Sequence, residues 1–101
     1  SKRAYLHLAA VLSQNFSNFL FGKAKKVLTN QHIDFSLLLP LLQQSVERLK
    51  FSDPSEVQTG PAVRGDQTTM ENHLQLIDDD ELKEIYRLLS INIQREHDKE
   101  L

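Results

Sequence analysis

A long apolar segment near the start of the chain places the strongest limit on its fold. From about Ala4 to Leu28, hydrophobic residues recur at the three- and four-residue spacing of an amphipathic helix. At about 100° per residue they cover more than half of the helix circumference, whereas a surface helix needs a stripe only slightly wider than about 100°. The segment therefore predicts a helix over residues 4–28 that is either wrapped by its own domain or buried partly by another copy or another domain.

A narrow polar strip occupies the rest of this predicted helix. His7, Gln14, Asn15 and Asn18 fall within an arc of about 100°. A helix face that is merely solvated carries Lys and Glu more often than such short amides and imidazoles. When buried, these groups need hydrogen-bond partners. Two arrangements stay open, in which the strip either bonds internally or lines a polar pocket.

The apolar pattern predicts three more helices, over residues 34–50, 67–77 and 79–97. Asp34 and Asp66 precede the first two of these as N-cap residues. Pro40 predicts either a kink or a break into a short turn and a longer helix. Asp78 and Glu81 resemble a capping box, so the acidic run around them belongs to a helix start rather than to a calcium site. With no convincing strand, the whole chain, 1–101, is predicted to be one all-α domain of about four helices.

The periodicity stops in a predicted loop over residues 51–66, which contains two prolines and two glycines. Loops of this length are uncommon within compact domains and are often functional. Thr59–Asp66 (TGPAVRGD) leads into a helix N-terminus with free N–H groups, and Arg64 adds a guanidinium that can hold a carboxylate or phosphate. Asp66 would compete for the same N–H groups. Ligand binding and loop architecture are therefore equally open. The charged tail of the last helix, residues 95–101, is predicted to fray.

Composition excludes several classes of site. The chain has no Cys and only three separated Gly, so it has no disulfide framework, no thiolate zinc site and no glycine-rich nucleotide loop. The four His form no metal-binding pair on one helix face, and no metal site is predicted. A net charge of −2, the lack of a membrane-spanning apolar run and the lack of a signal peptide predict a cytoplasmic domain without nucleic-acid or membrane partners. Because no initiator Met begins the sequence, we expect it to be cut from a longer chain.

Four short pieces of the sequence occur in the same order, with similar spacing, in one known family. They are Ala4–Phe16 (AYLHLAAVLSQNF), Leu39–Leu41 (LPL), Thr59–Asp66 (TGPAVRGD) and His73–Leu74 (HL). Over nearly its full length the chain resembles the C-terminal all-helical domain of uncharacterised function that follows an NAD(P)-binding Rossmann domain in bacterial oxidoreductases. These enzymes are related to pyrroline-5-carboxylate reductase and 6-phosphogluconate dehydrogenase. The resemblance implies a helical bundle like the C-terminal domain of the latter.

The resemblance also implies roles for individual residues. In such enzymes the helical domain builds the substrate pocket and supplies most of a homodimer interface, while an N-terminal Rossmann domain holds NADP or NAD. His7 is then the candidate catalytic residue, although related dehydrogenases carry a Lys on the corresponding helix. The residues that match the family pattern by position are His7, Asn15, Thr59, Arg64, Asp66 and His73. Gln14 and Asn18 join the substrate-binding set from the polar strip, and Thr69 joins it as the neighbour of His73 on one helix flank.

Two functions of different kinds follow. In the first, the chain is the substrate-binding and dimerisation domain of an NAD(P)-dependent oxidoreductase. It binds no cofactor itself, is inactive alone, and has a second copy, the Rossmann domain and a small-molecule substrate as partners. In the second, it is a non-catalytic helical module for protein interaction or dimerisation, and TGPAVRGD is only a connector. An upstream strand followed by G-x-G-x-x-G would decide for the first.

Overall fold

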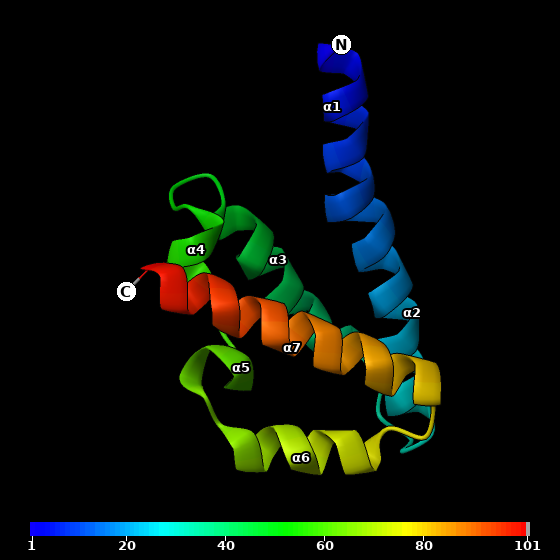
Figure 1. The fold of residues 1–101 in the computed structure, drawn as a ribbon. Coiled ribbons are helices and arrows are strands. Elements are labelled where there is room, and N and C mark those ends of the chain that lie inside the picture. Colours follow the sequence, from blue (N-terminus) through cyan, green and yellow to red (C-terminus); the bar gives the residue numbers. More distant parts are fainter. Residues whose placement is uncertain (101) are drawn as a thin grey trace. The chain divides into compact units, whose positions relative to one another are not determined.

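The computed structural model describes residues 1–100, and within that range it contains helices and turns but no strand (Figure 1). The helices are α1 Lys2–Ala10, η1 Val11–Asn15, α2 Phe16–Thr29, η2 Phe35–Leu38, α3 Leu39–Arg48, α4 Pro54–Val57, α5 Pro61–Arg64, α6 Gln67–Leu76 and α7 Asp80–Glu100. The predicted all-α fold class is confirmed. The chain divides into two compact units, Ser1–Leu39 and Pro40–Leu101.

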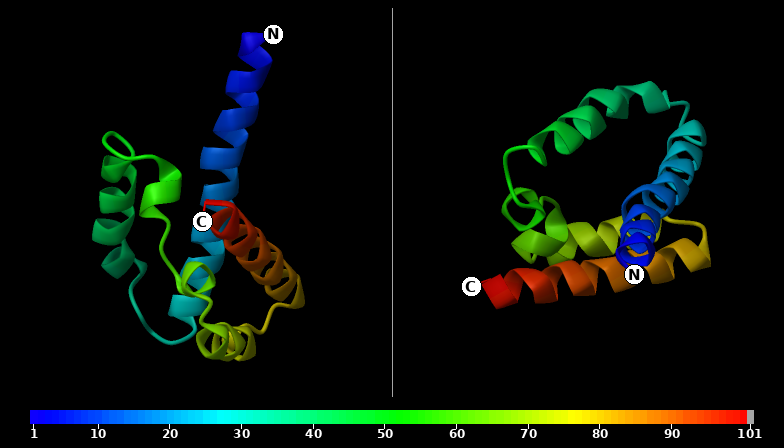
Figure 2. Two further views of the ribbon diagram at one scale, coloured as in Figure 1. Left: turned by 60° about the vertical axis from the view of Figure 1, so that its left-hand side comes forward. Right: turned by 90° about the horizontal axis from the view of Figure 1, so that it is seen from above.

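The first unit is dominated by α1, η1 and α2, which follow one another without interruption as a single helical rod (Figure 2). The Ser1 side chain caps its start by accepting a hydrogen bond from the Ala4 N–H at 3.3 Å. After α2, the chain turns into η2, a 3-10 helix whose N-cap is Asp34. Oδ1 of Asp34 accepts the Ser36 N–H at 2.8 Å, as expected for a cap.

The rod is not a uniform α-helix, because η1 is a π-helical turn. The Phe16 N–H bonds to the Val11 carbonyl, five residues back, instead of four. One extra residue in a turn offsets everything after it by about one residue's rotation, about 100°. The polar and apolar arcs calculated for a uniform helix therefore do not run straight from α1 into α2.

Proline and glycine positions set the elements that follow the rod. Pro40 lies in the first turn of α3, where a missing N–H costs nothing, so the 34–50 segment breaks into η2 and α3. The predicted loop 51–66 is interrupted by two single-turn helices, α4 and α5, which is a correction to the sequence prediction. Each begins with a proline at its first position, behind Asp53 and Gly60 respectively.

In the second unit, α6 and α7 run antiparallel and α5 packs against both (Figure 1). Asp66 caps α6, as predicted. At α7 the cap is one residue later than predicted, since Oδ1 of Asp79, not Asp78, accepts the N–H groups that follow. α7 continues to Glu100, beyond the predicted end at residue 97, with Lys99 and Glu96 paired at 3.4 Å on its last turns. The fraying predicted for residues 95–101 stays a prediction, and Leu101 lies outside the described residues.

Few side chains are buried within the described chain. Among residues 1–100, only Ala62 at 5% exposure and Met70 at 7% fall into the buried class, and both belong to the second unit. Along the rod of the first unit no residue is buried, and Leu8, Leu12, Phe16 and Phe19 are each more than half exposed. An apolar surface of this kind on a helix is typical of an interaction face.

The turn between α5 and α6 gives a first testable prediction. Gly65 ends α5 at φ 65° and ψ 30°, in the left-handed region that penalises any side chain. Gly65→Ala should lower the free energy of unfolding by about 1 kcal/mol, measured by urea denaturation followed by circular dichroism. Gly22→Ala is the matched control, because Gly22 lies within α2 and an added Cβ meets nothing within 4 Å. That change should raise the free energy by about 0.5–1 kcal/mol. Equal effects of the two changes would contradict this account of the turn.

Candidate functional site

The predicted site residues divide between the two units. His7, Gln14, Asn15 and Asn18 belong to the first unit and are all exposed. The predicted residues of the second unit are Thr59, Arg64, Asp66, Thr69 and His73. Among these, Asp66 and Thr69 are half-buried, while the other three are exposed.

The π-helical turn carries two of the predicted residues of the first unit, Gln14 and Asn15. Single π turns inside α-helices occur frequently at functional sites. Just before them, the Ser13 hydroxyl donates to the Ala9 carbonyl at 2.7 Å. His7 lies before this turn and Asn18 lies after it, so their relative direction differs from the one calculated for a uniform helix.

The TGPAVRGD segment is built largely by backbone requirements. Gly60 has φ 108° and ψ 170°, and Pro61 follows as the first residue of α5. Ala62 is buried, and the left-handed Gly65 closes the short helix with its N–H bonded to the Ala62 carbonyl at 3.2 Å. The Asp66 N–H then reaches the Pro61 carbonyl at 2.9 Å. These contacts account for the small residues of the motif and involve none of the side chains of Thr59, Arg64 and Asp66.

Asp66 and Thr69 are joined by two hydrogen bonds at the start of α6. Oδ1 of Asp66 accepts the Thr69 N–H at 3.1 Å, and Oδ2 accepts the Thr69 hydroxyl at 2.7 Å. These two bonds, the hydroxyl first, lower the pKa of the Asp66 carboxyl below its ordinary value, and the charges of Arg64 and His73 add to the effect. The Asp66 carboxylate therefore occupies the N-terminus of α6. As the sequence predicted, Asp66 competes with any anionic ligand for the N–H groups of this helix.

Arg64 is the exposed cation of this region. Its Nη2 lies 3.9 Å from Oδ2 of Asp66, and its side chain is 60% exposed. An ion pair at this distance and exposure is weak. The guanidinium therefore keeps donors that can reach a carboxylate or phosphate from solvent.

His73 and Tyr86 connect α6 to α7. Nδ1 of His73 lies 2.8 Å from the Tyr86 hydroxyl, and the two rings meet edge to face at 87° with centroids 5.8 Å apart. Burial raises the pKa of the Tyr86 phenol above its ordinary value. The apolar periodicity of α7 includes Tyr86 but says nothing of its hydroxyl, and only the antiparallel arrangement of α6 and α7 brings the His73 ring within hydrogen-bond distance of it.

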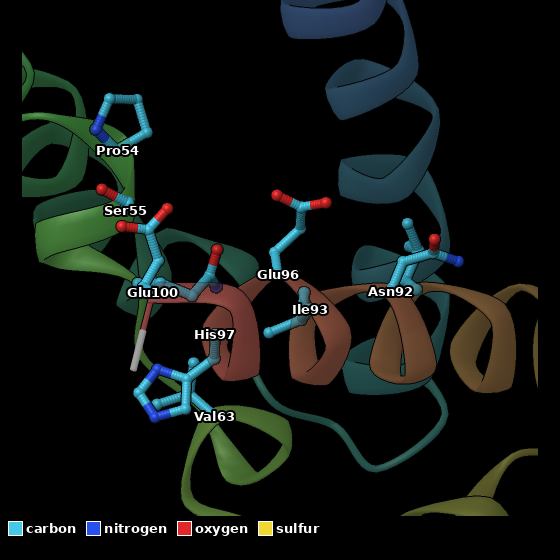
Figure 3. A pocket seen from close by; sticks show the side chains of 10 residues that line it. Pro54, Ser55, Val63, Asn92, Ile93, Glu96, His97 and Glu100 are labelled. Atoms are coloured by element: carbon cyan, nitrogen blue, oxygen red, sulfur yellow. The ribbon is translucent and has the colours of Figure 1, made fainter.

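A groove in the second unit lies apart from the predicted residues. It has a volume of about 320 Å³ and is bordered by α4, α5 and the C-terminal half of α7 (Figure 3). Its lining residues are Pro54, Ser55, Gln58, Val63, Leu89, Asn92, Ile93, Glu96, His97 and Glu100. Sequence analysis misses this groove because it predicts a loop where α4 stands and a frayed end where α7 continues. The Asp-Pro pair at residues 53–54 is the signal that could have revealed α4.

Two classes of site receive no support from the described residues. Within residues 1–100, no three His, Cys, Asp or Glu side chains are grouped so that they could hold a metal ion. No helix in the same range combines the length and the apolar character that a membrane crossing requires.

With fold and geometry described, comparison with known proteins identifies the class. Residues 1–93 match the family described as "Domain of unknown function (DUF2520)", and the chain belongs to this family of helical domains. It is also similar to a crystal structure of the "putative NADP oxidoreductase BF3122 from Bacteroides fragilis", with 37% sequence identity and a TM-score of 0.89. That match covers 93% of this chain and 37% of the Bacteroides protein, so the chain spans little more than a third of its relative. A comparison with curated proteins finds no match. The resemblance to a helical domain of unknown function from an oxidoreductase is thereby confirmed.

The Asp66–Thr69 pair predicts a pH dependence. A carboxyl whose pKa is lower in the folded state contributes stability that is present above the unfolded-state pKa and is lost as the pH falls through the folded-state pKa. Thr69→Val removes the hydroxyl bond and should raise the pKa of Asp66 toward its ordinary value, measured by carbon NMR of the carboxyl group. The loss of stability between about pH 6 and about pH 2 should then be smaller than in the wild type.

Thr68→Val is the control for this prediction. Thr68 is the exposed neighbour of Thr69, and Asp66 makes its side-chain bonds to Thr69. The control should leave the Asp66 pKa unchanged. A shift of equal size in both variants would contradict the assignment.

Proposed function

We propose that this chain is the substrate-binding and dimerisation domain of an NADP-dependent oxidoreductase and is not catalytic on its own. The observation that carries the proposal is its 37% identity, over 93% of its own length, with the Bacteroides fragilis protein described as a "putative NADP oxidoreductase". Because the chain corresponds to 37% of that protein, the remainder of an equivalent full-length protein has room for a nucleotide-binding domain. We assign NADP binding to that remainder, as an N-terminal Rossmann domain, in a bacterial cytoplasmic enzyme.

The proposed substrate contacts in the second unit centre on Arg64. Its exposed guanidinium offers paired donors to an anionic group of the substrate. Thr59 has an exposed hydroxyl at the start of the same motif, and His73 presents an exposed ring that is held on one side by Tyr86. Asp66 and Thr69 support this set by fixing the start of α6 behind Arg64.

The proposed contributions of the first unit come from the polar side chains of the rod. His7 is the proposed acid–base group, because one ring nitrogen of an imidazole can donate a proton and the other can accept one. Gln14 and Asn15 lie on the π turn and Asn18 lies one turn further on, and all three amides are exposed and available to bind substrate.

The exposed apolar side chains of the rod support the dimerisation part of the proposal. Leu8, Leu12, Phe16 and Phe19 are more than half exposed, and none of the rod's residues is buried. Large exposed apolar patches are aggregation hazards unless another surface covers them. A second copy of the same helix supplies a self-complementary cover.

Arg64→Ala in the full-length protein tests the substrate-binding proposal. Carboxylate- and phosphate-bearing carbonyl and imine compounds are screened for NADPH oxidation, and cofactor binding is followed separately by NADPH fluorescence. Arg64→Ala should raise KM for the substrate by about tenfold, because a charge-assisted bond to the anionic group is lost, while the affinity for NADPH stays unchanged.

Arg87→Ala is the matched control for this experiment, because Arg87 is an exposed arginine of α7 paired with Glu84 at 3.8 Å on its own helix. It should behave as the wild type does. Absence of NADPH binding by the full-length protein would favour the non-catalytic interaction module. Equal effects of Arg64→Ala and Arg87→Ala would remove Arg64 from the site.

Charge substitutions on the rod test the dimerisation proposal. The full-length protein should sediment as a dimer, and a variant carrying both Leu12→Glu and Phe16→Glu should sediment as a monomer, since two carboxylates on each copy cannot be buried in an apolar contact. A variant with Gln31→Glu, in the exposed turn after α2, should remain dimeric. Monomeric wild-type protein at high micromolar concentration would disprove this part of the proposal.

A further inference from the structure

The groove of about 320 Å³ in the second unit has an apolar floor and polar edges. Val63 reaches it from α5, while Leu89 and Ile93 reach it from α7. Val63 and Ile93 are half-buried. In the view of Figure 3, Ile93 lies near the middle of the lining side chains, Val63 lies below it beside His97, and Pro54 and Ser55 of α4 lie to the upper left. This floor can desolvate a small hydrocarbon body, and the volume lies at the small end of the range for ligand sites, about 300–1,000 Å³.

The permanently charged side chains that line the groove are all negative. Glu96 and Glu100 line it, and none of its lining residues is Lys or Arg. In Figure 3 the Glu96 and Glu100 side chains extend from α7 on the side of α4, whereas His97 extends on the side of α5. Lys99 lies 3.4 Å from Glu96, but both side chains are about three-quarters exposed, so this pair is weak.

Both acidic side chains are carried by one helix. Glu96 and Glu100 lie four residues apart on α7, so they belong to neighbouring turns of it. A cation in the groove is attracted by both carboxylates, whereas an anion is repelled by both. A metal ion is a poor occupant, because no group of three ligating side chains occurs in the described residues 1–100.

We propose that this groove binds a small organic cation, an ammonium group carried on an apolar body. The ammonium group lies between the carboxylates of Glu96 and Glu100, and the body lies on Val63, Leu89 and Ile93. Ser55 and Gln58 of the α4 edge offer further polar contacts at the rim. The inference stands independently of the proposed oxidoreductase role, since none of the residues assigned to substrate binding lines this groove.

Three probes with the same aromatic ring and different charge test the proposal in the full-length protein. They are benzylammonium, benzyl alcohol and phenylacetate, titrated at low ionic strength while the methyl signals of Val63, Leu89 and Ile93 are followed by NMR. Benzylammonium should shift these three signals and bind more tightly than benzyl alcohol by about fivefold, the effect of two weak exposed charge contacts. Phenylacetate should bind most weakly. Equal binding of all three probes, or no shift with any of them, would overturn the proposal.

Paired variants identify the carboxylates that are responsible. The double variant Glu96→Gln, Glu100→Gln should lower the affinity for benzylammonium by about fivefold and leave that for benzyl alcohol unchanged. The control double variant Glu71→Gln, Glu84→Gln removes two exposed carboxylates from α6 and α7 outside the groove. It should bind both probes as the wild type does. An equal loss in the two double variants would show a general charge effect and would refute a specific site.

Discussion

The second unit depends on one compact turn, in which a left-handed glycine is followed at once by a capping aspartate. Gly65 ends α5 after a single turn. Asp66, the next residue, then caps the start of α6 by accepting two hydrogen bonds from Thr69. Ala62 in α5 and Met70 in α6, the two buried residues of the described range 1–100, lie on either side of this turn in the sequence. The same turn leaves Arg64 outside, so backbone geometry and the position of the exposed guanidinium have a common origin.

Local signals made much of this fold predictable. Asp34 and Asp66 are caps because a short side-chain oxygen next to an apolar-periodic segment satisfies helix N–H groups, which involves only neighbouring residues. The prolines that follow Asp53 and Gly60 are equally local signals for α4 and α5. They are easily missed, because these helices are too short to show apolar periodicity. The family resemblance rested on short motifs of the same kind, and the family match bears it out.

Features that depend on packing or on departures from regular geometry could not be read in this way. A uniform step of about 100° per residue cannot anticipate the π turn at Val11–Asn15, because no residue type there specifies it. The bond between His73 and Tyr86 joins residues 13 apart and exists only because two helices pack antiparallel. The groove likewise requires α4 and the end of α7 to be in place together, so periodicity along either segment alone does not reveal it.

The π turn also changes how many surfaces one helix can serve. In a regular helix, side chains at helical spacing form one continuous face. A partner that binds the first half of this face therefore fixes the direction from which the second half can be contacted. The extra residue in η1 breaks that dependence, because it rotates the side chains of α2 by about 100° relative to a uniform continuation of α1. In the right-hand view of Figure 2, α1 is seen nearly end-on while α2 turns away from it, so the helix also changes direction along its length. One uninterrupted helix can thus present its two halves to neighbours that approach from different directions.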